Sequence, residues 1–205
     1  MSRQTARAEP ASSTRRRLAR VITEVLAPAP LAVVLLTLIA WDSAKSTSSA
    51  VLSAAVAVLF GSLLPFLYLI RGVRRGRWAN HHVPERELRS LPLLVGLASV
   101  LIGLGLLTWL GAGRQLLALV GAMIAGLVVS LAITQFWKMS IHAAVGAGTV
   151  VILMLVYGPW AALTWPIAAA IAWSRVALGD HTEAQVIAGC GVGAAIAGVA
   201  YSLLS

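Results

Sequence analysis

The segment QLLALVGAMIAGLVVSLAITQF, residues 115–136, decides the class of fold. It is long, apolar and free of charged side chains, as an α-helix that crosses the hydrocarbon core of a bilayer needs to be. It also lacks the alternation of polar and apolar residues that marks a strand of a membrane barrel. Since hydrocarbon cannot satisfy open backbone groups, the segment predicts a transmembrane helix.

The rest of the chain repeats this pattern. Of its 205 residues, 59% are hydrophobic and 11% are charged, and the mean hydropathy of +0.88 lies far above that of soluble domains. We read seven apolar segments as spans, namely 24–41, 50–70, 91–110, 115–136, 141–157, 160–173 and 182–204. Segment 160–173 is short and could form a bent hairpin with its predecessor, which would leave six full spans. We therefore expect an all-α, polytopic transmembrane bundle of six to seven spans, with residues 21–205 forming the membrane-embedded domain.

The net charge of +9 is concentrated in the tail from Arg3 to Arg20 and in the loop from Arg71 to Arg89. We expect residues 1–20 to form a disordered basic cytoplasmic tail. If the spans alternate from there, Lys138 and Arg175 lie on the same face as both basic blocks, which is the positive-inside pattern of a plasma-membrane protein. Neither block comes with a folded domain or interleaved aromatic residues, so nucleic acid is not an expected partner.

All four histidines fall in polar breaks between the apolar segments, and the count of spans puts these breaks on one face of the membrane. They are His81, His82, His142 and His181. His181 lies near the start of the last span, where free N–H groups favour an anion that the planar guanidinium of Arg175 could also reach. The clustering indicates an anion site, with phosphate as the first candidate. We read His81 and His82 as loop surface near lipid headgroups.

Two of these loops resemble signatures of the type 2 phosphatidic acid phosphatase superfamily. The dipeptide Ser174-Arg175, followed by five residues and then His181, matches the third signature, SRxxxxxHxxxD. The tripeptide Ser140–His142 is similar to the second signature, PSGH, with Met139 in place of the proline and Ile141 in place of the glycine. The order of the two loops along the chain is also that of the family.

The first signature of the family, KxxxxxxRP, is similar to the stretch from His82 to Arg89 if His82 replaces the lysine and Ser90 replaces the proline. The resemblance then covers about residues 70 to 204. In their general character, the loop sequences resemble those of an actinobacterial membrane branch of the superfamily.

The resemblance implies a role for each matched position. His181 would be the nucleophile that takes the phosphoryl group, and His142 would be the acid that protonates the leaving oxygen. Donors around the phosphate would be Arg175, Arg89 and Ser140, with Arg86 and Ser174 as further candidates. No cofactor and no metal ion are implied, because arginines supply the positive field.

The departure that bears most on the chemistry lies in the third signature. Where the third signature has an aspartate that orients the nucleophile, this chain has Gln185. A glutamine carbonyl can accept the imidazole N–H and fix the tautomer, but it adds no negative charge. Either Gln185 orients His181 alone, or Asp180 or Glu183 takes the place of the aspartate.

These residues together predict an integral membrane lipid phosphatase. Its substrate would be a phosphomonoester or diphosphate of a phospholipid or a polyprenyl-linked lipid of the cell envelope, hydrolysed through a phosphohistidine at a cytoplasmic site. The alternative is a non-hydrolytic lipid-phosphate binding protein or a prenyl-diphosphate cyclase on the same scaffold.

Other chemistries find little support in the sequence. It has no Gly-rich phosphate loop with lysine, no paired acidic motif for magnesium and no HExxH pair, and its one cysteine, Cys190, excludes an internal disulfide. The glycines of segment 182–204 indicate close helix packing, either within the monomer or in a homodimer.

Overall fold

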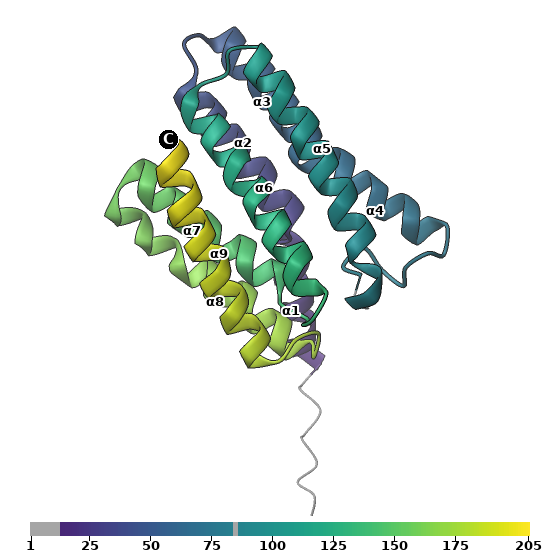
Figure 1. Ribbon diagram of the computed structural model, residues 1–205. Coiled ribbons are helices and arrows are strands. Elements are labelled where there is room, and N and C mark those ends of the chain that lie inside the picture. Colours follow the sequence, from purple (N-terminus) through teal and green to yellow (C-terminus); the bar gives the residue numbers. More distant parts are fainter. Residues whose placement is uncertain (1–12, 84–85) are drawn as a thin grey trace, which may run out of the picture.

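The structure is a computed structural model that describes residues 13–83 and 86–205, with the side chain of Arg86 outside the description. Within this part the chain forms only helices and their connections (Figure 1), which confirms the all-α prediction. The α-helices are α1 (Ser13–Val25), α2 (Pro28–Ser43), α3 (Thr47–Val58), α4 (Leu64–Arg74), α5 (Ser90–Trp109), α6 (Arg114–Thr134), α7 (Ile141–Tyr157), α8 (Trp165–Ala177) and α9 (Glu183–Leu204). A π-helical turn, Leu59–Leu63, joins α3 to α4, and 3-10 turns cover Arg86–Leu88 and Pro159–Thr164.

The number of spans is lower than expected. Four stretches in the described part are long and apolar enough to cross a bilayer: Thr47–Arg74, Ser90–Trp109, Arg114–Thr134 and Glu183–Leu204. The pair α1 and α2, bent by 41°, would be a fifth. Helices α7 and α8 have 17 and 13 residues, or about 25 and 20 Å, against a hydrocarbon core of about 30 Å. The chain turns back early at Gly158, whose φ is 94°, so α7 and α8 form a short hairpin.

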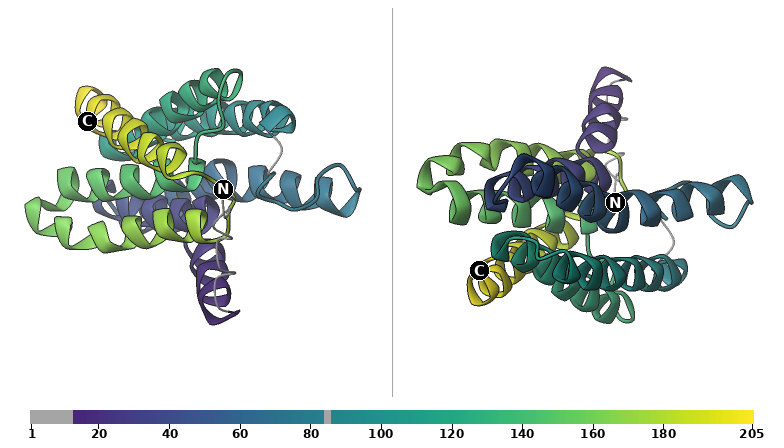
Figure 2. Two further views of the ribbon diagram at one scale, coloured as in Figure 1. Left: turned by 90° about the horizontal axis from the view of Figure 1, so that it is seen from below. Right: turned by 90° about the horizontal axis from the view of Figure 1, so that it is seen from above.

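The expected disordered tail is partly helical, because α1 includes residues 13–20. Its side chains Leu18, Val21 and Val25 are exposed and share one face at helical spacing, as in a helix that lies against lipid. Thr23, on another face, is buried where α1 packs against α8. Figure 2 shows α1 projecting from the side of the bundle. The rest of the expected tail lies outside the described residues.

Helices α7 and α9 pack closely through glycines of α9. A Cβ at Gly193 would meet the backbone of Ala144, and one at Gly189 would meet the Ser140 carbonyl oxygen. These two glycines therefore serve packing within the monomer. At the start of both helices, the Ser140 N–H donates to the Gln185 carbonyl at 3.2 Å. The close approach brings the second and third histidine loops side by side.

The α4–α5 loop folds back toward the same end of the bundle. Gly76, with a φ of 69°, ends α4, because the Arg77 N–H can then donate to the Gly72 carbonyl at 2.9 Å. The Trp78 ring packs on Gly72, where any Cβ would collide with it, and contacts the Tyr68 ring edge-on. This anchor directs the following residues, His81 and His82, into the bundle.

A π-helical turn precedes Pro65 in the wall of the bundle. Proline has no N–H, so a carbonyl of the preceding turn lacks its helical partner. The Ser99 hydroxyl donates to the Phe60 carbonyl at 2.7 Å, and the Ser62 hydroxyl donates to the Ala29 carbonyl at 3.0 Å. Both Ser62 and Pro65 line the cavity described next.

Candidate active site

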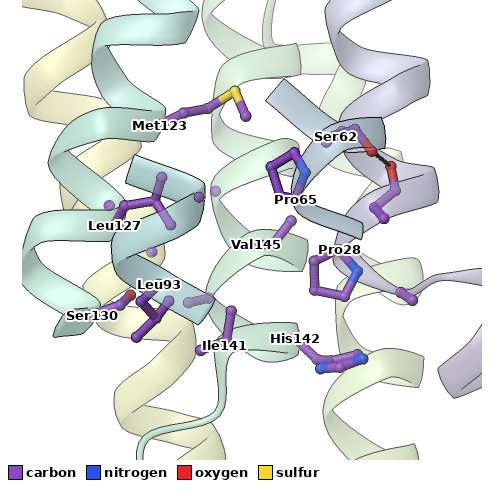
Figure 3. Close-up of a pocket in the computed structure, with 18 of the residues that line it drawn as sticks. Pro28, Ser62, Pro65, Leu93, Met123, Leu127, Ser130, Ile141, His142 and Val145 are labelled. Atoms are coloured by element: carbon purple, nitrogen blue, oxygen red, sulfur yellow. Dashed lines mark hydrogen bonds between the residues drawn. The ribbon is translucent and has the colours of Figure 1, made fainter. Parts of the chain in front are cut away.

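A cavity of about 350 Å³ extends from the histidine loops into the centre of the bundle. Its wall is made by apolar side chains of α2, α4, α5, α6, α7 and α9. In Figure 3, His142 lies at one end of this wall, beyond Leu93, Leu127 and Met123. The ionisable side chains that line the cavity are His81, His82, Arg89, His142, Arg175 and His181. All four histidines are thus brought together from three loops.

His181 precedes the N-cap of α9 and is 6% exposed. Its Nδ1 lies 3.1 Å from Gln185 Oε1, and the same oxygen accepts the Thr182 N–H at 3.2 Å. Because Oε1 only accepts, Nδ1 carries the hydrogen and Nε2 keeps its lone pair. Burial and then the charges of Arg89 and Arg175 lower the pKa of His181 to about 4. The ring is therefore a neutral nucleophile at physiological pH.

Arg175 is 3% exposed and rigidly held. Its Nη2 pairs with Asp180 Oδ2 at 2.9 Å, and its carbonyl accepts the N–H groups of Asp180 and His181 at 3.1 and 3.3 Å. Its Nε and Nη1 are buried and have no hydrogen-bond partner within the described part of the chain. The N–H groups of these two nitrogens can give charge-assisted hydrogen bonds to the oxygens of a phosphate.

Arg89 joins the first loop to the second. Its Nε donates to the Val83 carbonyl at 2.8 Å, and its Nη1 donates to the Met139 carbonyl at 3.2 Å. Val83 has a φ of 43°, a left-handed conformation that is costly for a β-branched residue. The strained turn thus places its carbonyl where it fixes the guanidinium at the cavity.

His142, on the first turn of α7, is 8% exposed, and its buried Nε2 has no hydrogen-bond partner among the described residues. The His82 ring meets it edge-on, with ring centroids 4.9 Å apart. Burial lowers the pKa of His82, and its hydrogen bond with Glu24 opposes this shift. Our assignment of His82 to the loop surface is therefore corrected: it lies within the site, where the resemblance puts the family's lysine.

Two serines expected to bind phosphate have other contacts. Ser174 is fully buried, its hydroxyl donates to the Ile171 carbonyl at 2.7 Å, and it lies 2.9 Å from the Thr23 hydroxyl. Ser140 is also fully buried and caps α7, with its Oγ accepting the Ala143 N–H at 3.4 Å. Neither lines the cavity. Both hold helices in place because a short hydroxyl can satisfy backbone groups there.

The other residues predicted for the site differ in whether they contact His181 or Arg175. Asp180 pairs with Arg175, so it orients the guanidinium, while Gln185 is the residue that contacts the His181 ring. Glu183 is exposed in the first turn of α9. The side chain of Arg86 lies outside the described residues.

Sequence reasoning missed Glu24, which belongs to the last turn of α1. Its carboxylate contacts His81 Nε2 at 3.1 Å and His82 Nε2 at 3.0 Å. A glutamate at the start of an apolar segment was the available signal, because a carboxylate next to hydrocarbon needs a partner.

Comparison with known families gives a match to the PAP2 superfamily over residues 130–205. This range contains α7, α8 and α9 with His142, Arg175 and His181. Comparison with curated proteins and with solved structures found no match. The likeness to an actinobacterial branch stays a prediction. The match confirms the resemblance read from the second and third loops: residues 130–205 match the type 2 phosphatidic acid phosphatase (PAP2) superfamily.

Proposed function

We propose that the protein hydrolyses a lipid phosphomonoester or diphosphate through a phosphohistidine at His181. One observation carries the proposal: a neutral imidazole whose Nε2 keeps its lone pair shares a cavity with a buried guanidinium, and Nε and Nη1 of that guanidinium have no partner among the described residues. The match to a superfamily of phosphatases supports the same class of phosphoric ester hydrolase.

The proposed chemistry has two steps. In the first, His142 is protonated as the phosphate anion binds beside it, His181 Nε2 attacks phosphorus, the bond from phosphorus to the lipid oxygen breaks, and that oxygen takes the proton from His142. In the second, water attacks phosphorus and gives a proton to His142, and the phosphorus–nitrogen bond breaks, which releases phosphate and restores His181. Arg175 and Arg89 stabilise the charge on the equatorial oxygens in both steps. No step needs a metal ion.

The apolar wall of the cavity suits the lipid chain of such a substrate. Its volume of about 350 Å³ is within the usual range of ligand pockets. The headgroup would lie at the histidines while the first carbons of the chain lie between the helices. The basic residues of the site loops favour a cytoplasmic face of the plasma membrane.

A second candidate, a non-hydrolytic lipid-phosphate binder or a prenyl-diphosphate cyclase, is favoured by one observation. Gln185 offers His181 an acceptor without a negative charge, so the charged phosphohistidine is stabilised less than an aspartate would allow. Tight binding of lipid phosphate without phosphate release would support this candidate.

The test is phosphate release by purified protein in mixed micelles, with phosphatidate and a prenyl diphosphate as separate substrates. We expect release that persists in EDTA, is inhibited by vanadate and is lost in His181→Asn. A melting curve of the variant must match the wild type, so that loss reports on chemistry and not on folding. Full turnover by a folded His181→Asn protein would refute the mechanism.

A further inference from the structure

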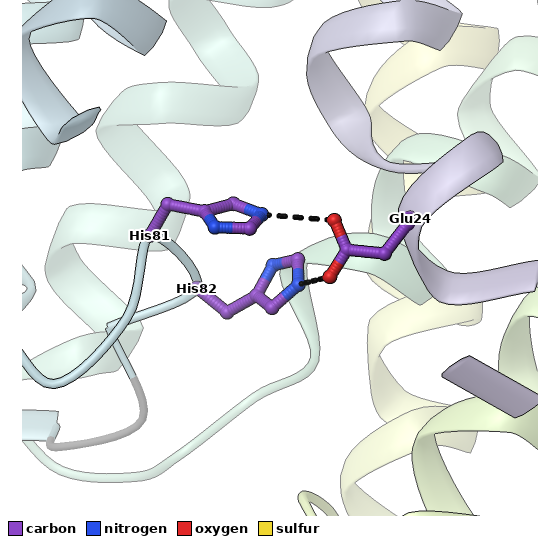
Figure 4. A group of neighbouring side chains, drawn as sticks. All are labelled: Glu24, His81 and His82. Carbon is purple, nitrogen blue, oxygen red and sulfur yellow. Dashed lines mark hydrogen bonds and ion pairs between the residues drawn. The ribbon is translucent and has the colours of Figure 1, made fainter. Parts of the chain in front are cut away.

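Glu24, His81 and His82 form a compact cluster that the proposed phosphoryl transfer does not use as a unit (Figure 4). Each carboxylate oxygen faces one imidazole nitrogen, at 3.1 and 3.0 Å. One ligand atom from each residue lies within 4.8 Å of the other two. The two rings are neighbours, with centroids 4.0 Å apart.

We propose that this cluster, the Glu24 cluster, binds one divalent ion of the zinc class. Two imidazole nitrogens and one carboxylate oxygen are the ligands that zinc prefers, whereas magnesium and calcium prefer oxygen ligands alone. Zinc ligands at about 2.0–2.2 Å from the ion lie roughly 3.3–3.5 Å apart in a tetrahedron. The present separations of 3.0 and 3.1 Å, with none above 4.8 Å, reach this geometry by small side-chain rotations.

An ion can reach the cluster, and the Glu24 carboxylate supplies a negative charge for it. The side chain of Glu24 is 48% exposed, and those of His81 and His82 are 25% and 14% exposed. Both histidines line the cavity whose arginines suit an anion, so the Glu24 carboxylate is a negative charge beside that anion. With a divalent cation bound, the cluster would carry a net positive charge, which attracts the anion.

The ion would act as a clip between distant parts of the chain. Glu24 ends α1, whereas His81 and His82 lie in the α4–α5 loop, 57 and 58 residues later. Joining them closes a long loop and would stabilise the fold. The clip also fixes the His82 ring, which packs against His142. Neither His181 nor either arginine is a ligand, so the site can exist whether or not the chain hydrolyses lipid phosphate.

The experiment is calorimetric titration of Zn²⁺ into the full-length protein in detergent, carrying no histidine tag and stripped with EDTA. We expect one Zn²⁺ per chain, and a melting temperature that rises with Zn²⁺. In Glu24→Gln, affinity should fall roughly 100-fold or more, because even outer-shell changes cost about 10- to 100-fold. Glu183→Gln, which removes an exposed carboxylate from the start of α9, is the matched control and should bind as the wild type does.

X-ray absorption of the zinc-loaded protein should give nitrogen and oxygen ligands with the signature of two imidazoles. If Glu24→Gln does not fold, His81→Asn serves the same test, with folding judged by melting in EDTA. The proposal is overturned if the wild type binds no Zn²⁺ at micromolar concentration, or if the wild type and the cluster variants bind it equally. Because binding is read without turnover, this outcome is independent of the phosphatase assay.

Discussion

Replacing Gln185 by glutamate should accelerate hydrolysis. The carboxylate has nearly the shape of the amide, so it can keep the 3.1 Å contact with His181 Nδ1 and the 3.2 Å contact with the Thr182 N–H. The change therefore adds one negative charge and little else. This charge stabilises the imidazole ring as positive charge develops on it during phosphoryl transfer.

The size of the rate increase follows from the distance between the new carboxylate and the ring. Two unit charges about 4 Å apart interact by about 4 kcal/mol at an effective dielectric constant of about 20. Gln185 is only half-buried, and Arg89 and Arg175 oppose charge on the ring, so we expect about a third to two thirds of this value. A gain of roughly 1.4–2.7 kcal/mol corresponds to about a 10- to 100-fold higher rate.

The same charge should raise the pKa of His181 above its value of about 4. A protonated ring has no lone pair for attack, so the acidic limb of kcat/KM should move to higher pH by about one to two units in the variant. Activity near pH 7 is unaffected by this shift, because the raised pKa still lies below 7.

The assay is phosphate release over a range of pH by the wild type, Gln185→Glu and Ala184→Glu. Ala184 is exposed on the same turn of α9, so its glutamate variant adds the same charge without the contact. A slower Gln185→Glu enzyme, or an equal gain in Ala184→Glu, would refute the reasoning.

Three further predictions test the phosphate site, the packing and the cavity. Arg175→Lys keeps the charge but loses the planar set of N–H donors, so kcat/KM should fall about 100- to 1000-fold in the release assay. Gly193→Ala should lower the free energy of unfolding by about 1–3 kcal/mol, measured by thermal unfolding. Gly191 has open space around it, so Gly191→Ala is the control and should change this free energy by less than about 1 kcal/mol. Gly126 lines the cavity, so the side chain in Gly126→Leu should occupy part of it. KM for a long-chain lipid phosphate should rise about ten-fold, whereas KM for an aryl phosphate should not change. Gly105→Leu, which faces open space, is the control.

The helices could largely be located from the sequence, because long apolar runs separated by polar breaks leave few alternatives. Segment 115–136 corresponds to Arg114–Thr134, and segment 182–204 corresponds to Glu183–Leu204. The short segments 141–157 and 160–173 were also located, and the structure has the hairpin that the sequence left as one of two alternatives, with the turn at Gly158. Helix α1 was missed because arginines obscure the helical spacing of its apolar residues.

The site could be predicted where its residues share one loop. The spacing of Arg175, His181 and Gln185 around the α8–α9 loop indicated that they lie together. In the structure Gln185 contacts the His181 ring, and the Arg175 carbonyl accepts the His181 N–H. Contacts between loops could not be predicted in the same way. The pairing of Glu24 with His82 spans 58 residues, and no periodicity in a sequence reports such a contact.

The two serines illustrate a second limit. Ser140 and Ser174 occupy positions that the family resemblance assigns to phosphate binding, but both are fully buried against the protein's own backbone. A hydroxyl is both a donor and an acceptor, so its partner depends on what packing places beside it. Both serines here contact backbone groups three residues away along the chain, and Ser174 also lies beside the Thr23 hydroxyl of α1.

The most direct test of the mechanism is to find where the phosphoryl group goes. The protein is mixed with an aryl phosphate, whose leaving group needs no proton from His142, and quenched in alkali because phosphohistidine is labile in acid. Mass spectrometry of the digest should find one phosphoryl group, on His181. The phosphorylated fraction should be larger in His142→Asn, because hydrolysis of the phosphohistidine then lacks its base. A phosphoryl group on any other residue, or steady turnover with His181 unmodified, would contradict the account.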